Sequence, residues 1–484
     1  MTEITLTPAI ELAQRVKRKE ISAVELLELH LQRYRQHNPA INAVIFTQID
    51  HAYEQAQAAD KAVALGKKTG PLHGIPMTIK DSYDWVGSPS TWGMPEMTDN
   101  YPEINAVAVQ RLLDAGAIIY GKSNVRFRLS DWQSYNEIYG VTNNPWDPTR
   151  TPGGSSGGAA AALATGMTSL EIGSDIGASI RNPAHFCGVY GHKPTMDIVP
   201  LHGHLLPGDT AYHDISVGGP LARSAGDLKL ALDILAGPTG DLEKAWQFQL
   251  PAPRKTNLSE FKVGVLMEST VCAQDEQLTE QLLDTVVALE KAGVQTDDTA
   301  DLGFDWYRYW EVYLLLFRAT TSASYSDEEY KFHLQSAASR KPDDTRYRAY
   351  LDRGITIRHR DWWALHDERE QMRLRWQAFF EDYDLLLCPV AASAAFVHDH
   401  LGERPDRTID INGQQELVVD QLFWAGLSGM VYLPSTVVPA GLTRSGLPCG
   451  LQLIAPYLED NTAIQFAQLM EDAVGGFQPP PGYE

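Results

Sequence analysis

The chain has 484 residues, with 40 Lys and Arg against 62 Asp and Glu, and a formal net charge of −22. Over most of the surface this charge would repel phosphate backbones and anionic lipids, so we expect neither a nucleic-acid partner nor a membrane partner. The sequence contains no run of about 18 apolar residues and begins with no charged and then apolar leader. We therefore expect a cytoplasmic protein, and its four scattered cysteines are expected to be buried free thiols.

The first elements predicted along the chain are helices. Pro8 is expected at the first position of one helix, and Ser22 with Glu25 forms a capping box that opens a second. After these helices, apolar runs typical of strands alternate with helical patterns such as 106–113 and 275–292. This alternation predicts an α/β fold around a mostly buried sheet. The expected strands are 42–47, 77–79, 117–120, 262–267, 385–390 and 450–454.

Residues 304–382 are predicted to form a helical insert rich in aromatic and charged residues. Aromatic side chains at this density usually build a core or an interface, and the alternative is that they line a pocket. Length alone suggests about three domains, although large α/β enzymes of similar length often fold as one domain.

Two short patterns suggest ligands that their context contradicts. Residues 116–123 match a phosphate-binding loop letter for letter, but a helical pattern precedes Gly116 and an apolar strand pattern follows it. His398, Asp399 and His400 are adjacent on a predicted loop, where three consecutive side chains cannot all face one metal ion. We expect neither a nucleotide nor a metal at these positions.

Two turns rich in glycine and serine carry the strongest functional signal. The first contains Ser155 and leads directly into a helix of small residues, and the second contains Ser179 and follows a short predicted strand. Glycine lets successive backbone N–H groups face one point, as an oxyanion hole requires. One helix and one strand across 24 residues would bring the two serines together.

A serine hydroxyl needs a base before it attacks a carbonyl carbon. His185 and His192 follow the second turn, but their apolar surroundings are typical of structural histidines. Lys80 ends the predicted strand 77–79, so its side chain can enter a site at the edge of the sheet. Lys80 is therefore the best candidate base for Ser155 and Ser179.

The pattern as a whole resembles the amidase signature family, whose members carry a Lys, a Ser in a cis peptide and a nucleophilic Ser. The resemblance covers nearly the whole chain and implies one amidase domain, 1–484, with a catalytic core at about 71–200 and a twisted mixed sheet covered by helices. Its motifs include Pro71-Leu-His-Gly-Ile-Pro-Met-Thr-Ile-Lys-Asp81, Tyr139-Gly-Val-Thr-Asn-Asn-Pro-Trp-Asp147, both serine turns and Gly446-Leu-Pro-Cys-Gly-Leu-Gln-Leu-Ile-Ala-Pro456.

Carried over by position, the resemblance implies that Ser179 is acylated, that Ser155 relays a proton and that Lys80 accepts it, with no metal or other cofactor. Burial would lower the pKa of Lys80, because the ammonium is the form that loses hydration. Oxyanion N–H groups are implied at Ile176, Gly177, Ala178 and Ser179, with Asp175 and Arg181 as supporting residues.

The sequence departs from the family pattern at two places. The family often has glycine where this chain has Ala178, which would be strained if that position needs a positive φ. The loop after Asn124 contains two arginines and differs from the usual pattern. Because this loop lines the pocket in the family, Phe127, Leu129 and Trp132 are predicted to contact substrate.

The leading hypothesis is an enzyme that hydrolyses small-molecule carboxylic amides, with esters or carbamates as side substrates. A second hypothesis is the glutaminase-like subunit of an amidotransferase, although the chain has Ser90-Thr91-Trp92 where we expect Thr-Thr-Cys in such subunits. A third is a non-catalytic scaffold, which would have lost a serine or the lysine. The sequence leaves open whether the chain forms a homodimer.

Overall fold

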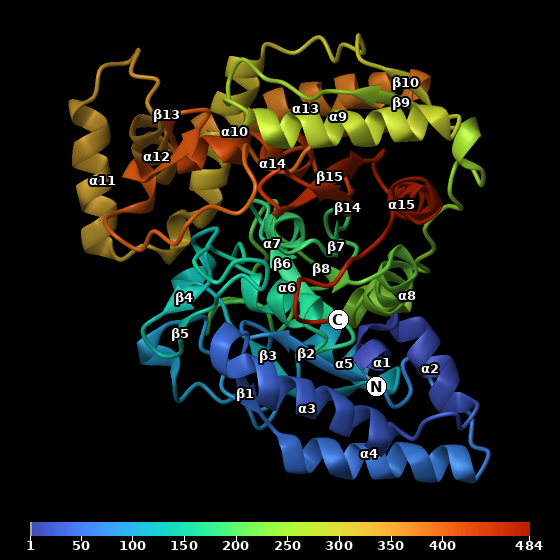
Figure 1. Ribbon diagram of the computed structural model, residues 1–484. Coiled ribbons are helices and arrows are strands. Elements are labelled where there is room, and N and C mark those ends of the chain that lie inside the picture. Colours follow the sequence, from blue (N-terminus) through green and yellow to red (C-terminus); the bar gives the residue numbers. More distant parts are fainter. Residues whose placement is uncertain (1) are drawn as a thin grey trace.

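The computed structural model describes residues 2–484, and its centre is a mixed sheet of eight strands within that range (Figure 1). Strand β9 pairs in parallel with β10 and β11, whereas all the other neighbours in the sheet are antiparallel. The order across the sheet is β10 (Gln295–Asp297), β9 (Lys262–Val265), β11 (Leu385–Pro389), β15 (Pro448–Ile454), β14 (Ser435–Leu442), β7 (Tyr190–Lys193), β8 (Val217–Ala222) and β6 (Glu171–Asp175).

A smaller sheet lies against the edge strand β6. It contains β1 (Val44–Thr47), β3 (Ile118–Ser123) and β2 (Pro76–Lys80) in that order, with β2 parallel to β3. Thr78 in β2 donates its hydroxyl to Glu171 of β6 at 2.6 Å, and its backbone N–H donates to Thr168 at 2.9 Å. The predicted strands thus belong to two sheets, and Lys80 stands where these sheets meet.

Helices cover the sheets, which confirms the predicted α/β class with a large mixed sheet. Helix α3 begins with the predicted Ser22–Glu25 capping box, whereas Pro8 caps α2 from the position before its first residue. None of the helices in residues 2–484 is long and apolar enough to cross a membrane. Outside 304–382 the helices are α1 (Thr2–Leu6), α2 (Ala9–Lys17), α3 (Ala23–Ile41), α4 (Ile49–Ala64), α5 (Val107–Asp114), α6 (Gly157–Ala164), α7 (Arg181–Cys187), α8 (Ala225–Leu235), α9 (Glu276–Lys291), α14 (Leu422–Gly429) and α15 (Asp460–Val474).

The insert at residues 304–382 is helical, as predicted, and its helices lie at the opposite end of the molecule from α3 and α4 (Figure 1). Tyr309, Tyr313 and Trp376 are buried in a second apolar core, whereas Tyr307 and Trp363 are exposed. Most of the aromatic residues therefore build a core, because the insert buries one face of each of its longest helices. Its helices are α10 (Trp306–Thr321), α11 (Asp327–Ser339), α12 (Tyr347–Ile355) and α13 (His359–Asp382).

Two short hairpins complete the strands. They pair β4 (Tyr135–Asn136) with β5 (Gly140–Val141), and β12 (Thr408–Ile411) with β13 (Gln414–Leu417). The four cysteines are buried and unpaired, as the sequence predicts: Cys187, Cys272, Cys388 and Cys449.

Candidate active site

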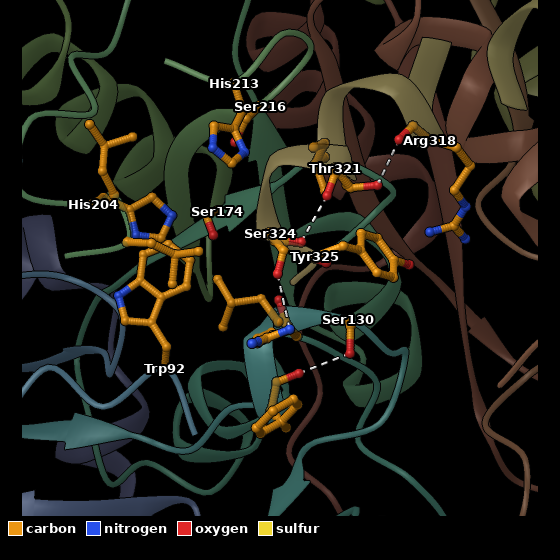
Figure 2. A pocket seen from close by; sticks show the side chains of 18 residues that line it. Trp92, Ser130, Ser174, His204, His213, Ser216, Arg318, Thr321, Ser324 and Tyr325 are labelled. Carbon is orange, nitrogen blue, oxygen red and sulfur yellow. Dashed lines mark hydrogen bonds between the residues drawn. The ribbon is translucent and has the colours of Figure 1, made fainter. Parts of the chain in front are cut away.

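The candidate site is a cavity of about 280 Å³ between the two serine turns, the 127–130 loop and the end of α10. Figure 2 places Trp92 and His204 on one side of it and Arg318 on the other. Ser155 and Ser179 both line it, so the structure brings the two predicted serines to one cavity. The remaining lining residues are Phe127, Arg128, Leu129, Ser130, Ser174, Ile176, Leu205, Leu206, His213, Ser216, Thr321, Ser324 and Tyr325.

Lys80 is fully buried at the end of β2, and its amine is surrounded by hydroxyl groups. Its Nζ lies 2.8 Å from Ser155 Oγ, 2.9 Å from Ser156 Oγ and 2.9 Å from Ser174 Oγ. Sequence reasoning linked Lys80 to Ser155 but missed Ser156 and Ser174. Ser156 directly follows Ser155 and Ser174 directly precedes Asp175, and this adjacency to predicted site residues is the signal that could have identified them.

Burial lowers the pKa of Lys80 to about 7, because the ammonium form loses its hydration, and the carboxylates of Asp175 and Glu171 oppose this shift only in part. Burial also raises the pKa of Glu171 to about 8. Glu171 is thus mostly neutral near pH 7 and contributes little charge that would hold the proton on Lys80. The site keeps a substantial fraction of Lys80 in its neutral, proton-accepting form at neutral pH.

The first serine turn is packed too tightly for a side chain before Ser155. A Cβ on Gly154 would lie 2.5 Å from the carbonyl oxygen of Asp131 and 2.6 Å from that of Gln133. The Gly154–Ser155 peptide is cis. Ser156 donates its N–H to the carbonyl oxygen of Ser179 at 3.2 Å, which joins the two turns directly.

The second serine turn is held by Asp175, the last residue of β6. Its carboxylate accepts the N–H of Ala178 at 2.9 Å and that of Ile180 at 3.1 Å, and it forms a fully buried ion pair with Arg181 at 2.9 Å. Arg181 also donates to Gln452 Oε1 at 2.8 Å, which ties the turn to β15. These contacts hold the turn in place, and a supporting role for Asp175 and Arg181 in catalysis stays a prediction.

Comparisons with known proteins identify the family. A family model described as Amidase matches residues 25–464. The chain belongs to the amidase family. It is 33% identical to an acylamidase of Rhodococcus erythropolis over 97% of this chain and 96% of the relative. It is also 31% identical to a glutamyl-tRNA(Gln) amidotransferase subunit of a Cyanothece species, over 96% of this chain and 97% of the relative.

A solved structure supports the same fold. A bacterial aryl acylamidase of the amidase signature family superposes with a TM-score of 0.81 and 24% identity, over 97% of this chain and 96% of that one. At this level of identity the likeness concerns the fold alone. The family match and the 33% identity to an acylamidase show that this chain is a hydrolase acting on amides.

The sequence predicts that three backbone N–H groups before Ser179 bind an oxyanion, and one of them already donates a hydrogen bond within the protein. The Ala178 N–H donates to Asp175, and Ala178 adopts a φ of +70°. Ala178 is therefore a residue of the turn, held in the left-handed region that costs a non-glycine residue about 1 kcal/mol. Within residues 2–484 the N–H groups of Ile176, Gly177 and Ser179 donate to no protein acceptor.

The three residues predicted to contact substrate occupy different places in this amidase. Phe127 and Leu129 line the cavity, so a role in substrate contact stays a prediction for both. Trp132 is not part of the lining: it is buried, and its indole N–H donates to the carbonyl oxygen of Gly177 at 2.6 Å. The sequence pointed to this loop, but only packing decides that Trp132 lies behind the second serine turn.

Three groups in the cavity wall were not foreseen from the sequence. His204 stacks between Tyr83 and Trp92, with ring centroids 4.3 and 5.0 Å apart, and burial lowers the pKa of His204 to about 3, which keeps it neutral. Arg318 and Tyr325 come from the insert. No local motif marks these residues, because they reach the cavity through tertiary packing.

The two discarded patterns lie outside the cavity. Lys122 of β3 is buried and donates to the carbonyl oxygens of Asp81 and Pro89 at 2.9 and 2.7 Å, so this segment is a strand and not a phosphate loop. His398 faces Asn143 at 3.1 Å, and His400 stacks on Tyr135 with ring centroids 3.7 Å apart.

The two histidines near the second serine turn are buried, and their ring nitrogens have partners. His185 contacts the carbonyl oxygen of Ser393 at 3.0 Å, and His192 contacts Thr436 and Asp460 at 2.9 and 3.1 Å. Both are structural histidines, as their sequence surroundings indicate.

Proposed function

We propose that this chain is a serine amidohydrolase in which Ser179 is acylated, Ser155 relays the proton and Lys80 is the base. The observation that carries the proposal is the 2.8 Å contact between Lys80 Nζ and Ser155 Oγ, in a buried site where the pKa of Lys80 is about 7. Ser155 and Ser179 line the same cavity, which supports a proton relay between them.

In acylation, the Ser179 oxygen attacks the amide carbonyl while its proton passes to Ser155, whose own proton passes to the neutral amine of Lys80. The resulting ammonium returns a proton through Ser155 to the amide nitrogen, so that the C–N bond breaks and a neutral amine leaves. Water then attacks the ester on Ser179 and loses its proton along the same path. The acid is released, and Ser179 recovers its hydroxyl.

The negative charge that develops on the carbonyl oxygen needs donors that are already oriented. The backbone N–H groups of Ile176, Gly177 and Ser179 are the candidates, because in the described part of the chain they have no protein acceptor and belong to the turn that holds the nucleophile. Asp175 and Trp132 position this turn through its N–H groups and the Gly177 carbonyl.

The wall of the cavity favours amides with an aryl or alkyl group. Phe127, Leu129, Ile176, Leu205 and Leu206 supply apolar surface around the two serines. Esters and carbamates are proposed as side substrates, because they form the same kind of acyl or carbamoyl ester on a serine. The 33% identity to an acylamidase agrees with this choice.

A second candidate function is that of the glutaminase component of an amidotransferase, favoured by the 31% identity to one component of such an enzyme. Ammonia release from glutamine by the purified chain, measured beside hydrolysis of aryl amides, separates the two. The amidohydrolase proposal expects aryl amides to be cleaved without any partner protein. Release of ammonia from glutamine alone would favour the second candidate.

The direct test of the proposal is labelling with a fluorophosphonate, read by intact mass. The wild-type protein should gain one phosphonyl group, whereas Ser179→Ala should gain none and Lys80→Ala should react far more slowly. Ser216→Ala is the matched control, since it removes another serine of the same cavity and should keep the label. Labelling of Ser179→Ala at the wild-type rate would overturn the assignment.

A further inference from the structure

Two arginines line the active-site cavity and come from different parts of the chain. Arg128 lies on the loop after β3, and Arg318 lies in the last turn of α10. The lining contains no Asp or Glu among the described residues. The chain as a whole has a net charge of −22. The two arginines and the lack of a carboxylate therefore give the cavity a charge opposite to that of the whole chain.

Arg318 has no carboxylate partner among residues 2–484. Its guanidinium lies over the rings of Phe317 and Tyr347, 4.5 and 5.3 Å from their centroids, and it donates to the Tyr347 hydroxyl. Over the same range its Nε has no acceptor, and no Asp or Glu is among the charged groups that shift its pKa. Burial lowers the pKa of Arg318 to about 10, so the side chain still carries its charge at neutral pH.

Arg128 also has an unsatisfied guanidinium nitrogen, although its charge helps to lower the pKa of Glu329. It donates to the carbonyl oxygen of Ser324 at 3.0 Å, which links its loop to the turn after α10, while its Nε has no acceptor in the described part of the chain. A neighbouring arginine outside the cavity behaves differently: Arg407 pairs with Asp131 at 2.5 Å.

A desolvated guanidinium without an anion is costly, and a planar carboxylate matches its fork of donors. The cavity therefore has an apolar wall next to the serines and an unpaired cationic region supplied by Arg128 and Arg318. We propose that the substrate is an amide that also carries a carboxylate, which Arg318 and Arg128 bind while Ser179 attacks the amide. This inference rests on the proposed function for the identity of the bond that is cleaved.

The test measures binding without turnover, by isothermal titration of the Ser179→Ala variant. The probes are glutaric acid mono-4-nitroanilide, with its carboxylate on the acyl side, and 4-acetamidobenzoate, with its carboxylate on the amine side. Each is compared with its neutral isostere, in which a carboxamide replaces the carboxylate: the mono-4-nitroanilide of glutaramide or 4-acetamidobenzamide. We expect at least one acid to bind about tenfold or more tightly than its isostere, and the better acid identifies the side that faces the arginines.

Removing the charge should remove this preference. In Ser179→Ala combined with Arg318→Gln, the acid should lose about 10- to 100-fold in affinity, while the neutral isostere changes little. Arg318→Lys should keep part of the preference, since the charge remains but the fork of donors is lost. Arg360→Gln is the matched control, because Arg360 belongs to the same insert and its side chain is 87% exposed.

Two results would overturn the inference. One is equal affinity for both acids and their isosteres, and the other is a preference that survives in both Arg318→Gln and Arg128→Gln. If Arg318→Gln fails to fold, as its affinity for the neutral isostere and its Tm would reveal, Arg128→Gln decides alone. Failure of the proposed function gives a different result: the wild-type protein would bind these probes but cleave no amide.

Discussion

The serine turns between residues 151 and 193 and the helical insert at 304–382 line the same cavity but are built in different ways. In the turns, nearly every residue is buried and polar groups bond to one another, as in the buried pair of Asp175 and Arg181. The insert has its own apolar core, and only the end of α10 and the following turn reach the cavity. The comparison suggests that the turns supply the chemistry and that the insert selects the substrate.

The largest expected effect is a loss of kcat, and it should be far greater for a serine of the turns than for a serine of the insert. Ser155→Ala should lower kcat by a factor on the order of 10⁴ or more, because the members of a proton relay act as a unit. Ser324→Ala, which alters the same cavity from the insert side, should cost at most about tenfold. Steady-state kinetics on one aryl amide measures both, and equal losses of kcat would contradict the view that the turns and not the insert supply the chemistry.

The pH dependence should report Lys80 and not the arginines of the cavity. The neutral amine is the active form, so activity should rise with pH through the pKa of about 7 and fall about 50-fold from pH 7 to pH 5. Arg318, with a pKa of about 10, keeps its charge over this range, so Arg318→Gln should leave the midpoint in place. Lys80→Arg should be inactive at every pH. A flat wild-type profile between pH 5 and pH 8 would contradict Lys80 as the base.

Ion pairs in the two regions should differ in their contribution to stability. Asp175→Asn leaves the buried guanidinium of Arg181 without its counter-charge, and it should lower the free energy of unfolding by about 3 kcal/mol. Asp361→Asn breaks an exposed pair of the insert with Arg358 and should cost less than about 1 kcal/mol. Urea unfolding followed by circular dichroism gives both values, and similar losses would argue against a rigid nucleophile turn.

An alanine-to-glycine substitution should stabilise the protein in the second serine turn and destabilise it in the insert. Ala178→Gly removes the strain of a φ of +70° and should stabilise the protein by up to about 1 kcal/mol. Ala319→Gly, inside α10, should destabilise it by about 1 kcal/mol, because glycine is a poor helix former. Differential scanning calorimetry separates the two. Destabilisation by Ala178→Gly would mean that its methyl group contributes packing that outweighs the strain.

Much of the fold follows from local patterns. Strands β2, β3, β9, β11 and β15 lie where apolar runs predict them, and α3 begins at its capping box. The division into two sheets was not predictable, since strand periodicity does not say which strand becomes a neighbour. That division matters here, because Lys80 stands on one sheet and Ser174 on the other.

The site divides in the same way. The two glycine-rich turns and the strand-end lysine pointed to Lys80, Ser155 and Ser179, and the structure brings both serines to one cavity with Lys80 bonded to Ser155. Their catalytic roles stay a prediction. Trp132 was wrongly placed in the substrate pocket, and the Ala178 N–H, expected in the oxyanion hole, is bonded to Asp175. Both outcomes depend on the direction in which a single group points, which composition does not encode.

The sequence by itself predicted the α/β class from local patterns and the family from the resemblance of its motifs, and it supplied the three residues of the proposed relay, because all of these depend on segments that are short in the chain. Only the tertiary structure decided which groups surround Lys80 and how far burial lowers its pKa. It also decided that Arg318, 139 residues after Ser179, lines the same cavity. Distances between segments far apart in the chain are determined by packing, and desolvation and charge pairing depend on those distances.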